Sequence, residues 1–173
     1  YVRYLNRSLA FDWLHGYPGF DAALKDQVAA DLVAGAERML ALPSLADPAQ
    51  ASYHNHTVRE LALAVFSLVA VEGHPSVEGR AAPLRAHAWR AFDNVLEQTE
   101  LVNPDGGYHE STDYMRITWA PLAMMAEVRR TATGEDPASR WSVFRNMGTT
   151  YLYKVLPDGS AARADDNEVP HLD

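Results

Sequence analysis

The feature that most constrains this chain is the spacing of apolar residues over residues 58–69, where they recur every three or four positions. That period places them on one face of an α-helix. Thr57 and Glu60 have the T-x-x-E spacing of a capping box and predict a start near Thr57. Gly73 and Pro75 predict its end. The apolar face comprises Val58, Leu61, Ala62, Val65, Leu68 and Val69.

The same period predicts five further helices. Pro121 must either kink the helix that contains it or begin a new one. Asp136 and Pro137 predict an N-cap and a first helical position. We expect Leu24 on the inner face of the helix at 21–42 and Gly148 on the inner face of the helix at 136–154. The predicted ranges are about 2–14, 21–42, 82–101, 114–130 and 136–154.

Composition supports an all-α fold, because Ala and Leu dominate and β-branched residues are sparse. The 173 residues suffice for one domain with a real core. We therefore expect residues 1–173 to form a single domain of stacked helical hairpins. Three hairpins would form an arc with two open ends, so we expect another domain to cap it or the chain to be part of a larger protein.

Charge and composition exclude several classes. The chain lacks cysteine, so it has no disulfide or thiolate metal site. A formal net charge of −8 argues against nucleic-acid binding. No apolar run reaches the roughly 18 residues of a membrane span, and the start at Tyr1 shows no signal pattern. The two histidines of His54-x-His56 alone are weak grounds for zinc, so we expect no metal and no cofactor.

Two polar segments stand out, at residues 53–56 and 105–116. They precede the third and fifth predicted helices, so stacked hairpins would place them on one rim. Each also has a structural explanation. His54 and His56 could bond the free N–H groups of the following helix, and Tyr108 could be an ordinary half-buried aromatic.

The motifs together resemble the heparinase II/III-like polysaccharide lyases. D-G-G-Y-x-E-x-x-x-Y at 105–114 is similar to their D-G-x-Y-x-E-G-x-x-Y signature, with Ser111 in place of the second glycine. Asn-His at 55–56 resembles a segment of the same families and of related alginate lyases. Residues 11–14 and 156–167 resemble their Y-D-W-L, L-P-D-G and G-D segments.

This resemblance implies part of an (α/α) toroid, followed by a β-sandwich domain that this chain does not contain. It also implies an acidic polysaccharide substrate, such as a glycosaminoglycan or alginate, and a secreted or periplasmic enzyme. Neither nucleic acid nor a membrane is expected as a partner.

Cleavage of a uronate chain by β-elimination needs a base, an acid and donors that neutralise the carboxylate. Asn55 and His56 lie at a helix N-terminus, which favours anions. The resemblance favours Tyr114 over Tyr108 as the proton carrier. His54, Tyr108, Arg59, Glu110 and Arg116 are then candidate substrate-binding residues, although Arg59 could equally be a solvated helix residue.

Two other functions remain open. A glycoside hydrolase on a similar helical scaffold would use Glu110 and Asp113 as its carboxylate pair. A non-catalytic helical scaffold would tolerate Tyr114→Phe and His56→Ala without loss of function.

Overall fold

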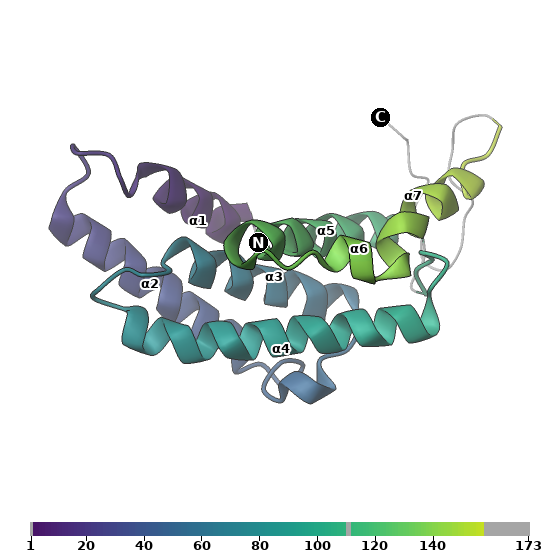
Figure 1. The fold of residues 1–173 in the computed structure, drawn as a ribbon, viewed down its shortest axis with the longest axis horizontal. Coiled ribbons are helices and arrows are strands. Elements are labelled where there is room, and N and C mark those ends of the chain that lie inside the picture. The colour runs from purple at the N-terminus through teal and green to yellow at the C-terminus, as the bar shows by residue number, and fades with distance from the viewer. Residues whose placement is uncertain (1, 110–111, 158–173) are drawn as a thin grey trace. The chain divides into compact units, whose positions relative to one another are not determined.

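The computed structural model describes residues 2–109 and 112–157, and it is all-helical, at 73% helix with no strand in those ranges (Figure 1). The all-α prediction is confirmed. None of the helices in this part of the chain is long and apolar enough to span a membrane. The helices are α1 (Val2–Leu14), α2 (Ala22–Leu40), the 3-10 helix η1 (Pro48–Gln50), α3 (Asn55–Ala70), α4 (Glu78–Val102), α5 (Thr112–Thr133), α6 (Pro137–Arg140) and α7 (Ser142–Tyr153).

The chain divides into two compact units. The first contains Tyr1–Ser52 and Arg59–Asn94, and the second contains Tyr53–Val58 and Val95–Asp173. Two of the three boundaries fall inside α3 and α4, and the third lies between Ser52 and Tyr53, just before α3. Both polar segments singled out in the sequence therefore belong to the second unit.

In the first unit, α1 and α2 form an antiparallel pair (Figure 1). Asp21 caps α2 by accepting a hydrogen bond from the Leu24 backbone N–H at 2.9 Å. Leu24 itself is 48% exposed, which contradicts its predicted place on the inner face. It lies in the first turn of α2, before the buried residues of that helix begin at Ala29.

Arg85 joins the end of α3 to the start of α4. Its Nη1 donates to the backbone carbonyl of Leu68 at 3.2 Å, and its Nη2 donates to Glu78 Oε1 at 2.6 Å. The other Glu78 oxygen accepts from the Gly73 N–H at 2.8 Å. The Arg85 hydrogen bond is the main reason that the pKa of Glu78 is lowered. This network lets α4 begin at Glu78, a full turn before the predicted start near residue 82.

The predicted capping box at Thr57 and Glu60 is wrong. α3 begins at Asn55, and its first helical carbonyl is that of His54, which accepts from the Val58 N–H at 2.9 Å. Thr57 is buried in the first turn, and Glu60 accepts from the Ser44 hydroxyl at 3.1 Å. The imidazole of His54 does the capping instead, because a side-chain acceptor before a helix meets its free N–H groups.

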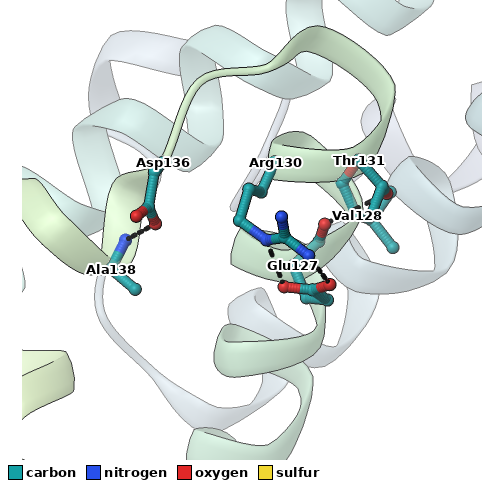
Figure 2. A network of polar contacts seen from close by, with 6 residues as sticks. All are labelled: Glu127, Val128, Arg130, Thr131, Asp136 and Ala138. Atoms are coloured by element: carbon teal, nitrogen blue, oxygen red, sulfur yellow. Dashed lines mark hydrogen bonds and ion pairs between the residues drawn. The ribbon is translucent and has the colours of Figure 1, made fainter.

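Pro121 neither ends nor restarts a helix, because α5 continues through it. The buried Thr118, Leu122 and Met125 lie on both sides of it and hold the helix in place. Figure 2 shows the end of α5, where Arg130 donates from Nε and Nη2 to the two Glu127 oxygens at 2.8 and 2.6 Å.

The last predicted helix is two helices. Asp136 caps α6 as predicted, accepting from the Ala138 N–H at 3.1 Å (Figure 2). Trp141 is extended and separates α6 from α7. Because of this break, the apolar spacing expected for one continuous helix does not hold in α7, where Val143 is buried. Gly148, expected on the inner face, is exposed.

The start of α7 is bound to the turn that follows α4. The Ser142 hydroxyl donates to Glu100 Oε1 at 2.6 Å, and Asn146 Nδ2 donates to the Pro104 carbonyl at 2.7 Å. Gly106 has a φ of +81°, and a Cβ there would lie 2.3 Å from the backbone N of Met147. Only glycine fits both the conformation and the space.

Gly106→Ala tests this close approach against Gly134→Ala, its matched control. Gly134 has a φ of +79°, but a Cβ added there would meet nothing within 4 Å. Gly134→Ala should cost about 1 kcal/mol of unfolding free energy from backbone strain alone. Gly106→Ala should cost at least about 1 kcal/mol more, because α7 must move away. Urea unfolding of both variants measures the difference, and equal losses would show that α7 does not press on the turn.

Candidate functional site

The histidines at the start of α3 are paired. The rings of His54 and His56 are stacked, with centroids 5.5 Å apart and planes at 19°. The backbone N–H of His56 donates to Nδ1 of His54 at 3.3 Å. This bond requires that Nδ1 of His54 carries no proton, so a neutral His54 has its proton on Nε2. Asn55 between them is buried at 3% exposure, whereas His56 is exposed.

The first part of the D-G-G-Y motif forms a turn. Asp105 Oδ1 accepts from the Gly107 N–H at 2.9 Å, a hydrogen bond typical of an Asx-turn. Gly106 supplies the positive φ and the room for α7. Asp105 and Gly106 therefore have structural explanations that are independent of any chemistry.

Aromatic packing brings the two polar segments together. The ring of Tyr53 lies edge-on to Tyr108, with centroids 5.0 Å apart, and 5.9 Å from the ring of His109. Tyr108 and His109 also pack on each other at 4.9 Å. Tyr53 and Tyr108 are both buried at 5% exposure. We call Tyr53, His54, His56, Tyr108 and His109 the tyrosine–histidine cluster.

His109 is a candidate that the sequence reasoning missed. Although the residue is exposed overall, packing of its ring against the two tyrosines partly desolvates it. This burial, and secondarily the charge of a protonated His54, lower the pKa of His109. A neutral, accessible imidazole suits a general base near neutral pH. The signal was available, since histidine is the commonest acid–base residue, but the position is variable in the resembled motif.

Of the remaining predicted site residues, the structure describes the side chains of Tyr114 and Arg59. Tyr114 is half-buried in the first turn of α5, and Arg59 is half-buried in the first unit. Glu110 and the side chains of Asp113 and Arg116 lie outside the described residues, as does the motif-like stretch at 158–167. The structure thus joins residues 53–56 to Tyr108 and His109, and the placement of Tyr114 against His56 stays a prediction.

Within residues 2–109 and 112–157, no three His, Cys, Asp or Glu side chains are grouped so that they could hold a metal ion. His54 Nδ1 is already engaged by a backbone N–H. The imidazole, phenol and amide groups of these residues can transfer protons and form hydrogen bonds.

Comparisons with family models, curated proteins and solved structures found nothing that matches this chain. The features of the second unit that bear on function are the joined polar segments, the lowered pKa of His109 and the structural turn beside them.

The pKa of His109 gives a direct test of the cluster. Proton NMR of the imidazole should show a titration midpoint below the ordinary value of about 6.5. His54→Asn keeps a good helix cap but removes the neighbouring charge, so the midpoint should rise while staying below that value. His15→Asn, in the first unit, is the control and should leave the midpoint unchanged.

The linked effect on stability has a definite sign. Because the pKa of His109 is lowered on folding, the unfolded chain binds more protons as the solution becomes acidic. This contribution to the free energy of unfolding is present above about pH 6.5 and is lost as the pH falls through the pKa of His109 in the folded protein. A His109 midpoint at or above the ordinary value would contradict the packing of its ring against the tyrosines.

Proposed function

We propose that this protein is a polysaccharide lyase that cleaves a uronate-containing chain by β-elimination, on part of an (α/α) toroid. The observation that carries the proposal is the packing of Tyr53 on both Tyr108 and His109, which draws the two motif-bearing segments into one cluster. The resemblance of both segments to heparinase II/III-like lyases supports the same reaction.

The proposed reaction needs no metal, cofactor or added water. A base removes the proton beside the uronate carboxylate, the electron pair forms a carbon–carbon double bond, and the glycosidic oxygen leaves with a proton from an acid. The barrier is high because the neighbouring carboxylate is already negative, so donors must neutralise it. Asn55 and His56, at the positive end of α3, are assigned that role.

Tyr114 is assigned the proton transfers, and its position in the first turn of α5 leaves it half-buried. A phenol with a pKa of about 10 needs a nearby positive charge to act as a base. His109, whose lowered pKa favours the neutral form, is a second group able to accept a proton at neutral pH. Glu110 and Arg116 remain proposed substrate-binding residues, with His54, Tyr108 and Arg59.

A non-catalytic helical scaffold is the second candidate, and one observation favours it. Asp105 closes a turn, Gly106 makes room for α7, and Tyr108 is buried against Tyr53. Half of the D-G-G-Y-x-E-x-x-x-Y motif is thus accounted for by folding. Only the loss of turnover in variants that fold normally separates the two functions.

Tyr114→Phe, with Tyr108→Phe as its matched control, tests the mechanism. Each change removes one hydroxyl and keeps the ring. If Tyr114 transfers the protons, Tyr114→Phe should lower kcat at least about a hundredfold with little change in KM. Tyr108→Phe should be milder, because that buried ring packs on Tyr53. The measurement is ultraviolet absorbance of unsaturated products from heparin-like, chondroitin-like, alginate and glucuronan polymers.

The ranking of the two variants decides the assignment. If Tyr108→Phe abolished elimination while Tyr114→Phe kept it, the proton carrier would be Tyr108. If both variants kept full activity, the tyrosine mechanism would be wrong, and His109→Gln would then be expected to abolish turnover. An absence of unsaturated product from every polymer would favour the scaffold.

A further inference from the structure

The second unit contains a hollow that is separate from the tyrosine–histidine cluster. It lies between α7 and the turn after α4 and has a volume of about 420 Å³. The hydrogen bond from Asn146 Nδ2 to the Pro104 carbonyl, and the one from the Thr150 hydroxyl to the Asp105 carbonyl, hold its two walls together. Its lining consists of Asp105, Asn146, Thr149, Thr150, Tyr153 and Lys154.

The polar groups of the hollow include both hydrogen-bond donors and hydrogen-bond acceptors. Asp105 Oδ1 is used by the Gly107 N–H, which leaves Oδ2 as an acceptor. One N–H of the Asn146 amide is engaged by the Pro104 carbonyl, which leaves the other N–H as a donor and the amide oxygen as an acceptor. Lys154 makes no ion pair with any residue that the structure describes, so its ammonium can act as a donor. The carboxylate and the ammonium balance one another in charge.

One of the residues that line the hollow is aromatic. Tyr153 is 87% exposed, although aromatic side chains of this size are usually well covered. An exposed ring offers a flat apolar face beside the hydroxyl, amide and charged groups. A pyranose ring has this combination of surfaces, with an apolar C–H face and hydroxyls around its edge. A phosphate or a fatty chain would use only one of the two kinds of surface.

We propose that this hollow is a sugar-binding subsite that holds a uronate unit away from the bond that is cleaved. Asp105, Asn146 and Thr149 bind its hydroxyls, Tyr153 covers its apolar face, and Lys154 pairs with its carboxylate. Asp105 precedes Tyr108 by three residues, so their Cα atoms are at most about 11 Å apart. One polysaccharide chain can therefore contact both places. The assignment of the ligand as a uronate rests on the proposed lyase function.

The test compares oligosaccharides of increasing length in two pocket variants, Lys154→Gln and Tyr153→Ala. Leu152→Ala is the control, because Leu152 is 72% exposed on the same helix but does not line the hollow. Both pocket variants should raise KM about tenfold for long uronate oligosaccharides. They should leave kcat unchanged, and they should also leave KM unchanged for the shortest substrate that is cleaved. The control should match the unchanged protein at every length.

The outcomes separate the subsite from the lyase function. Elimination with an unchanged KM at every length in both pocket variants overturns the subsite and leaves the lyase standing. If no polymer is cleaved, the lyase proposal fails, and NMR titration with uronate tetrasaccharides from glucuronan and alginate decides the subsite. Shifts of the Thr149 and Thr150 amide signals that disappear in Lys154→Gln support it. The absence of any shift in the unchanged protein overturns it.

Discussion

The backbone of Gly106 lies so close to the backbone of Met147 that a single added carbon would overlap it, and the packing of α7 against the turn after α4 depends on that contact. The hydrogen bonds from Ser142 and Asn146 hold the same helix there. The same turn directs the chain into Tyr108 and His109, whose rings meet Tyr53. One tight turn therefore constrains both the tyrosine–histidine cluster and the polar hollow beside α7.

The chemistry of the cluster follows from partial burial. Imidazoles in bulk water titrate near neutrality, whereas the ring of His109 packs against two tyrosine rings and lies near a second histidine. Both effects favour its neutral form. The ring of His54 is committed to a backbone N–H of α3, which fixes its orientation and, when it is neutral, its tautomer. The cluster thus combines an oriented imidazole, an imidazole whose neutral form is favoured, and two buried tyrosines.

Helical periodicity predicts the all-α class and most helix positions, because apolar spacing and N-caps such as Asp136 are local signals. It fails where side-chain contacts outside the apolar pattern decide the outcome. The start of α4 depends on Arg85 and Glu78. The first turn of α3 is capped by His54, which agrees with the structural explanation considered for the histidines and not with the expected T-x-x-E pattern. From the sequence alone, Pro121 predicts a kink or a break in its helix. The helix continues because the residues around Pro121 are buried, and the sequence does not show that burial.

The candidate site can be predicted in part. The segments around Asn55 and Tyr108 are expected to meet, and Tyr53 joins them, but the importance of His109 depends on ring packing that no spacing reveals. The structural role of Asp105 and Gly106 is also hidden in the sequence, because it requires the position of α7. A motif residue can thus match a catalytic family and still be explained by folding.

The most direct test of the central claim is cleavage of a uronate polymer in water enriched in heavy oxygen. Elimination breaks the glycosidic bond without adding water, whereas hydrolysis places one solvent oxygen in the products. The proposed mechanism predicts unsaturated, ultraviolet-absorbing ends whose mass spectra show no heavy oxygen from bond cleavage. Products that carry one heavy oxygen at each broken bond and lack the absorbance would contradict it and identify a hydrolase instead.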